Sequence, residues 1–102
     1  MEISKHYSRE RQSREDAIRL IGEGKPFVTF EVDRGHKNGP EIHKISDTGI
    51  ITIFNKNSGK LITKLIARPG QIDRYYWEQG LMPPTFLMNQ ARRNVQLGLN
   101  LL

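Results

Sequence analysis

Two runs of β-branched and aliphatic residues in the middle of the chain predict a pair of strands. Ile50 to Phe54 and Leu61 to Ala67 flank the polar segment 55–59, and two such runs joined by about five residues that include a glycine are typical of a β-hairpin. Along the second run, Leu61, Thr63, Leu65 and Ala67 alternate with Ile62, Lys64 and Ile66. Apolar residues occur in both sets, so we expect a strand with one face fully buried and the other half covered.

Two further runs predict the other strands of the same sheet. Phe27 to Val32 places Val28, Phe30 and Val32 opposite Phe27, Thr29 and Glu31, and Glu41 to Ser46 follows the polar loop 33–40. The turn residues Asp47-Thr48-Gly49 then lead into the central hairpin. Four strands joined by short loops form an antiparallel meander.

Helical periodicity marks the segments around the sheet. Ser13 before the stripe Ala17, Ile18, Ile21 predicts an N-capped helix that ends at Gly22 and packs on the sheet. The basic residues before Ser13 form either an extra turn or a loose arm. Residues 71–79 predict a short helix, with Ile72, Tyr75 and either Tyr76 or Trp77 facing inward.

The C-terminal segment predicts a last helix. Pro83 and Pro84 interrupt any helix before it, and Thr85 can cap the next one. An apolar stripe then follows at spacings of three and four residues: Met88, Ala91, Val95, Leu99 and Leu102. Because further leucines lie off this stripe, we expect Met88–Leu102 to form a homodimer or to dock on a protein partner.

The predicted fold class is therefore α+β. An N-terminal helix packs on a four-stranded antiparallel meander, and a short helix and a C-terminal helix follow. Residues 1–80 form the core domain, and residues 81–102 form the Pro-Pro linker and the apolar helix. A chain of 102 residues suffices for one modest core.

Composition removes several classes of function. The chain has no cysteine, which excludes disulfides, thiolate metal sites and a thiol nucleophile. No apolar run approaches the roughly 20 residues that span a bilayer, and the N-terminus lacks the apolar core of a signal peptide. We expect a cytoplasmic protein with no membrane partner.

The charge balance points toward nucleic acid. The formal net charge is +5, and no acidic residue follows Glu78. Neutralisation of phosphates drives the association of basic proteins with nucleic acids. The same charge would also keep a protein dispersed in solution, and both interpretations stay open at this point.

Histidines and cations supply the candidate chemistry. Attack of an RNA 2′-hydroxyl on its own phosphate needs a base, an acid and a cation near the phosphate, and imidazole can exchange protons near neutral pH. The candidate catalytic residues are His6, His36, His43 and Arg68, and the candidate phosphate ligands are Arg9, Lys37, Lys64 and Thr63. Asp33, His36 and His43 carry metal-ligand side chains without a recognised metal spacing, so we predict neither a metal nor a cofactor. Ordinary surface histidines remain the alternative interpretation.

Three short motifs carry a resemblance to known proteins. They are Lys5-His6-Tyr7-Ser8-Arg9, Gly49-Ile50-Ile51 and Ile66-Ala67-Arg68-Pro69. With one helix followed by four antiparallel strands, the chain resembles the barnase–EndoU–colicin–RelE-like group of small ribonuclease toxins and related phage and toxin-locus domains. The resemblance implies that His6 is the helix-side acid or base and that Arg68 and Thr63 contact phosphate.

Two functions of different classes follow. The first is metal-independent cleavage or binding of RNA by histidine, arginine and lysine at a basic sheet edge, with RNA as the partner and an endoribonuclease as the enzyme class. The second is a non-catalytic interaction protein of phage or mobile-element type that acts through its C-terminal helix.

Overall fold

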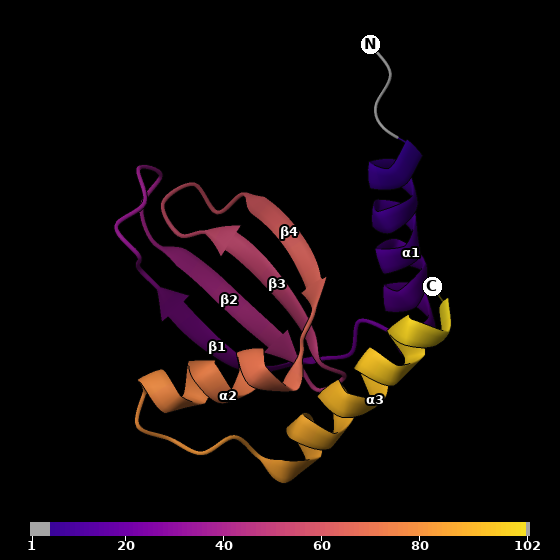
Figure 1. Cartoon of the computed structure of the whole chain (residues 1–102). Helices are drawn as coiled ribbons and strands as arrows, with labels where there is room; N and C mark the ends of the chain where they lie inside the picture. Colours follow the sequence, from indigo (N-terminus) through magenta and orange to yellow (C-terminus); the bar gives the residue numbers. More distant parts are fainter. Residues whose placement is uncertain (1–4, 102) are drawn as a thin grey trace.

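A computed structural model describes the backbone of residues 5–101 and the side chains of residues 13–98. Within these residues the elements are α1 (Lys5–Ile21), β1 (Pro26–Val32), β2 (Glu41–Ser46), β3 (Ile50–Asn55), β4 (Leu61–Ile66), α2 (Pro69–Glu78) and α3 (Thr85–Leu101). The strands form one antiparallel sheet in the order β1-β2-β3-β4 (Figure 1). The predicted α+β fold is confirmed.

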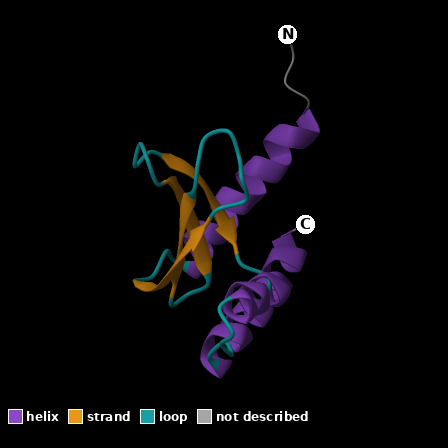
Figure 2. Ribbon diagram, turned by 90° about the vertical axis from the view of Figure 1, so that its left-hand side faces the viewer, coloured by secondary structure: helices purple, strands orange, loops and turns teal. Residues whose placement is uncertain are grey.

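The two faces of the sheet differ in what covers them. One cross-strand row contains Phe30, His43, Ile53 and Thr63, and the next contains Val28, Ile45, Ile51 and Leu65. Helices α2 and α3 lie on the side of these rows (Figure 2). The opposite face carries the row Thr29, Lys44, Thr52 and Lys64. Within residues 5–101 no helix lies over its centre, and α1 stands beside the β4 edge (Figure 1).

The core lies between the sheet and the last two helices. Ile45 and Ile51 of the sheet, Ile72 of α2, and Leu87 and Ala91 of α3 are each fully buried. They form one cluster, so α3 packs as part of the same body as residues before position 80.

The buried row of α3 differs from the predicted one. Leu87, Ala91 and Asn94 are buried, whereas Met88 and Val95 are only half-buried. Ala91 belongs to both rows, and Leu87 and Asn94 replace their expected neighbours Met88 and Val95. Because α3 contacts α1, α2 and β4, its most enclosed row faces the corner between these elements. Leu99 and Leu102, the rest of the predicted stripe, lie outside the described side chains.

One other expectation is wrong, and one choice that the sequence left open is decided. The first helix begins at Lys5, so Ser13 lies inside it and cannot be its N-cap. Residues 9–12 are good helix formers without glycine or proline, and they continue the helix backward. On α2, Tyr76 faces inward and Trp77 is 78% exposed, which decides between the two residues left open by the sequence.

A register shift changes the expected orientation of Leu61. Ile53 pairs with Thr63, but the next residue, Phe54, pairs with Leu61, so Ile62 has no partner of its own. An extra residue of this kind reverses which face the following side chain uses. Leu61 therefore lies with Phe54 and Lys64 on the uncovered face, rather than with Thr63.

Candidate nucleic-acid interface

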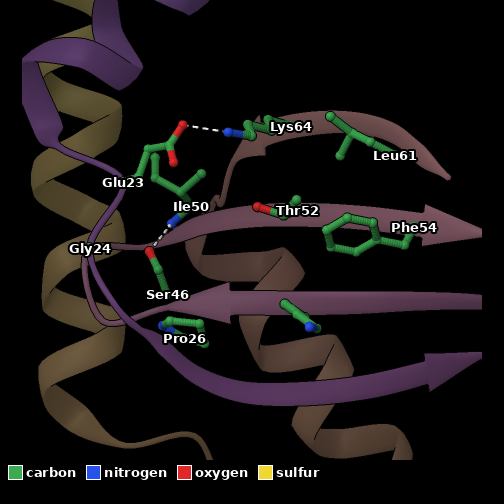
Figure 3. A pocket seen from close by; sticks show the side chains of 10 residues that line it. Glu23, Gly24, Pro26, Ser46, Ile50, Thr52, Phe54, Leu61 and Lys64 are labelled. Carbon is green, nitrogen blue, oxygen red and sulfur yellow. Dashed lines mark hydrogen bonds and ion pairs between the residues drawn. The ribbon is translucent and has the colours of Figure 1, made fainter. Parts of the chain in front are cut away.

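The uncovered face of the sheet holds a depression of about 420 Å³. Its walls come from all four strands and from the connection between α1 and β1 (Figure 3). The lining residues are Glu23, Gly24, Pro26, Lys44, Ser46, Ile50, Thr52, Phe54, Leu61 and Lys64. It combines two ammonium groups, one carboxylate, two hydroxyl groups and an apolar surface, and we call it the sheet depression.

Of the two lysines in this depression, Lys44 has no carboxylate partner among the residues that the structure describes. Its ammonium lies 5.4 Å from the centroid of the Phe54 ring, and among the described residues it makes no ion pair. A cation over an aromatic face is attracted by the ring quadrupole. The contact holds the ammonium at the sheet surface without neutralising its charge, so the charge is available to an anion.

Lys64 is held differently. It forms an ion pair with Glu23 of the α1–β1 connection, and Figure 3 shows this pair across the upper wall. The side chains of Lys64 and Glu23 are 34% and 62% exposed, and such exposed pairs contribute only about 0–1 kcal/mol to stability. An incoming phosphate could therefore replace the Glu23 carboxylate at little cost.

The α1–β1 connection is fixed by the turn between β2 and β3. The Thr48 hydroxyl lies 2.7 Å from the Gly22 carbonyl oxygen and 3.0 Å from that of Glu23. The Lys25 N–H donates to the Asp47 carboxylate at 3.0 Å, and the Asp47 N–H donates back to the Lys25 carbonyl at 2.9 Å. These bonds set the position of Glu23 relative to β4.

Gly24 allows this close approach. Its φ is +71°, and a Cβ there would lie 2.3 Å from the Asp47 carboxylate oxygen. A side chain would therefore be strained by the backbone and would also collide with the turn. Gly24 therefore lets the connection that carries Glu23 lie close against the turn, where it forms one wall of the depression.

A second polar cluster lies on the covered face. His43 is 4% exposed, its Nε2 lies 2.9 Å from the Glu41 carboxylate, and its Nδ1 is hydrogen-bonded to the Tyr75 hydroxyl. A carboxylate only accepts, so Nε2 carries a proton, and in the neutral ring Nδ1 then accepts from the Tyr75 hydroxyl. The cluster joins β2 to α2. Burial is the largest cause that raises the pKa of Tyr75, and the nearby Arg34 guanidinium partly opposes it.

The structure separates most of the predicted catalytic residues. His43 is buried with both nitrogens bonded, and His36 and Lys37 are exposed in the loop before β2. Arg68 precedes α2 at the opposite end of the strands, where Ala67 bonds to Gly49. His6 and Arg9 belong to α1, but their side chains lie outside the described residues.

Two predicted phosphate ligands do lie near the sheet depression. Lys64 lines it directly, and the half-buried Thr63 lines a neighbouring depression between α1 and β4. Among the described side chains, no three His, Cys, Asp or Glu residues are grouped so that they could hold a metal ion.

The sequence did not single out Phe54 or Glu23 for this site, and Lys44 stood out only as one of several cations near the sheet. Lys44, Thr52 and Lys64 are polar positions in otherwise apolar strands, and this pattern was the available signal. The correct register places them side by side, and register depends on the bulge at Ile62. Glu23 reaches the site only through the tertiary contacts of Thr48 and Asp47.

Comparison of the chain with protein-family models, with curated proteins and with solved structures found no match. Within the described residues, no helix has both the length and the apolar character needed to cross a bilayer.

Proposed function

We propose that this protein binds single-stranded RNA on the uncovered face of its sheet. The observation that carries the proposal is the Lys44 ammonium, free of any described carboxylate and placed over Phe54 in a depression that also contains Lys64. An RNA ligand agrees with the net charge of +5 and with the cytoplasmic location expected from the sequence.

The depression suits a single strand better than a duplex. Known single-strand sites combine cations that follow the backbone with aromatic and apolar surfaces that contact exposed bases. Here Lys44 and Lys64 supply the cations, and Phe54 and Leu61 supply the apolar surface. In a duplex the base faces are stacked inside, so the apolar part of the depression would have no ligand.

Binding has more support than cleavage. A metal-independent ribonuclease needs an acid and a base near one phosphate. Among the described side chains His43 is enclosed, and His36 and Arg68 lie at opposite ends of the sheet. Cleavage would depend on His6, the residue that the toxin resemblance implies. Incubation of RNA with the protein in EDTA, with His6→Ala and His36→Ala alongside, tests this activity.

One observation favours the second class of function, a protein-interaction domain. Trp77, Leu81, Met82 and Phe86 are exposed apolar side chains around the linker and the start of α3. A homodimer or protein partner that uses the C-terminal helix would then contact this region rather than only Met88–Leu102. The mass of a monomer in light scattering across a wide concentration range would exclude the homodimer.

A salt titration with a fluorescein-labelled single strand tests the RNA proposal. Binding should weaken as salt rises, with a log–log slope of about −0.7 per phosphate contact. Lys44→Ala should lower affinity several-fold for all sequences alike and reduce the slope by about that amount, since it contacts phosphate rather than bases.

Lys37→Ala is the matched control, because it removes the same charge from the loop before β2, outside the sheet depression. Absence of binding at low ionic strength would refute the proposal. Loss of affinity with Lys37→Ala and not with Lys44→Ala would place the RNA at the loop edge and refute the use of the open face.

A further inference from the structure

A second depression adjoins the first one across β4. It has a volume of about 450 Å³ and lies between α1 and the β4 edge. Its lining residues are Arg14, Glu15, Ile18, Arg19, Glu23, Leu61, Ile62, Thr63 and Lys64. Three of them, Glu23, Leu61 and Lys64, also line the sheet depression, so the two share a wall. We call the second one the helix–strand cleft.

The cleft repeats the chemistry of the sheet depression. Arg14 makes no ion pair among the described residues, whereas Arg19 is paired with Asp16 at 2.7 Å. Leu61 and Ile62 form an apolar surface and are 53% and 50% exposed. A guanidinium can bond two phosphate oxygens at once, and exposed aliphatic side chains can contact a base or ribose.

Lys64 lies where the two depressions meet. Together the depressions contain four cations, Lys44, Lys64, Arg14 and Arg19, and two carboxylates, Glu15 and Glu23. Asp16, which pairs with Arg19 from outside the lining, offsets a further cation, so one positive charge remains in excess. Release of Lys64 from Glu23 would leave an ammonium within reach of a ligand in either depression. This balance of charge favours an anionic chain that passes from one to the other.

Building on the proposed RNA binding, we infer that the helix–strand cleft is a second subsite for the same single strand. The strand crosses the β4 edge with one phosphate at Lys64. The next nucleotides enter the cleft, where Arg14 binds phosphate and Leu61 and Ile62 contact a base. The cleft therefore sets how many nucleotides the protein covers.

The dependence of affinity on RNA length tests this inference. Known single-strand sites span about 4–16 nucleotides, so labelled oligonucleotides of about 3 and about 10 nucleotides separate one subsite from two. Arg14→Ala should weaken binding of the longer strand several-fold and leave the shorter strand unchanged. Lys44→Ala should weaken both.

Arg93→Ala is the matched control, because Arg93 is exposed on α3 and lines neither depression. Far-UV circular dichroism of each variant verifies that it is folded. Equal affinity of wild type and Arg14→Ala for the longer strand, with Lys44→Ala still weakened, would refute the second subsite alone. Equal losses for both lengths in Arg14→Ala would refute it too. If neither the shorter nor the longer strand binds, both the proposed function and this inference are refuted.

Discussion

The Lys64 ammonium on β4 is paired with the Glu23 carboxylate, although 41 residues separate them in the chain. The pair stands in the wall shared by the sheet depression and the helix–strand cleft. In the free protein Glu23 occupies the position that a phosphate would take. The carboxylate is thus a built-in competitor of the proposed ligand.

Glu23→Gln should therefore raise RNA affinity several-fold. The amide keeps the size of the side chain and removes its charge, so a phosphate no longer displaces an anion from Lys64. The salt slope should steepen by up to about 0.7, because Lys64 then contributes counterion release. Stability should change by no more than about 1 kcal/mol, as for other exposed pairs. Fluorescence anisotropy at several salt concentrations measures the first two quantities.

Glu31→Gln is the control for this change. Glu31 pairs with Lys56, and neither residue lines the two depressions. Both variants alter the net charge equally, so a similar gain in affinity for both would mean that net charge alone acts, contrary to the prediction.

Tyr75→Phe should destabilise the fold by about 1–3 kcal/mol. The change leaves Nδ1 of the buried His43 without its donor, and an unsatisfied buried polar group costs about that much. Tyr76→Phe is the control, since the Tyr76 hydroxyl makes no hydrogen bond among the described residues while its ring packs on Phe30. Urea unfolding measures both. Equal midpoints for the two variants would show that the Tyr75 hydroxyl does not support the fold, and RNA affinity should change in neither.

Alkaline pH should destabilise the protein through the same tyrosines. Burial raises the pKa of Tyr75 and of Tyr76 above the usual value of about 10. Above that value the unfolded chain releases these protons while the folded chain retains them, so the free energy of unfolding falls as pH rises. Stability from this source is complete below pH ~10. Urea midpoints between about pH 8 and 11 should fall less steeply for Tyr75→Phe; an unchanged slope would contradict the prediction.

The strands were predictable because period-two alternation reports directly on a two-faced sheet. β2 begins and ends where the sequence indicates, and the other strands differ by one residue at an end. The start of α1 could not be predicted in the same way, because Ser13 is compatible both with an N-cap and with a helix interior. The helix-forming residues before Ser13 extend the helix back to Lys5. The buried row of α3 depends on three neighbouring elements, and no local pattern contains that information.

The candidate site was predicted less well for a related reason. Residue type identified Lys64 and Thr63, but the faces they use depend on the bulge at Ile62 and on the position of α1. His43 attracted a catalytic role because of its imidazole, although Ile45, two residues further along the strand and therefore on the same face, is fully buried in the core. Its two partners, Glu41 and Tyr75, give it a structural role as the junction of β2 and α2.

Truncation after Gly80 should unfold the protein. It removes Leu87 and Ala91 from the core, together with the bond from the buried Asn94 amide to the Thr48 carbonyl at 2.7 Å. Burial of one leucine side chain contributes about 1.5–3 kcal/mol, a large part of the roughly 5–15 kcal/mol that stabilises a small domain. Circular dichroism should show loss of a cooperative thermal transition. A truncated protein with a native-like transition would show instead that residues 1–80 fold alone, as their predicted status as a domain requires.

Gly24→Ala should destabilise the fold more than Gly22→Ala does. Both glycines have positive φ, +71° and +85°, and alanine in this region costs about 1–2 kcal/mol. Only at Gly24 would the new Cβ meet neighbouring atoms, the nearest being the Asp47 carboxylate oxygen at 2.3 Å, whereas nothing lies within 4 Å at Gly22. The Gly24 variant must also weaken the bond from the Lys25 N–H to Asp47, which adds about 1 kcal/mol.

Urea unfolding of the two variants isolates the effect of the close approach, because the backbone strain is common to both. Displacement of the connection should also separate Glu23 from Lys64, so Gly24→Ala should bind RNA with an affinity nearer to that of Glu23→Gln than to wild type, measured where both variants are folded. Equal unfolding free energies for Gly22→Ala and Gly24→Ala would contradict this account. The turn at Asp47 would then not hold the α1–β1 connection in place, and the wall between the two depressions would need another cause.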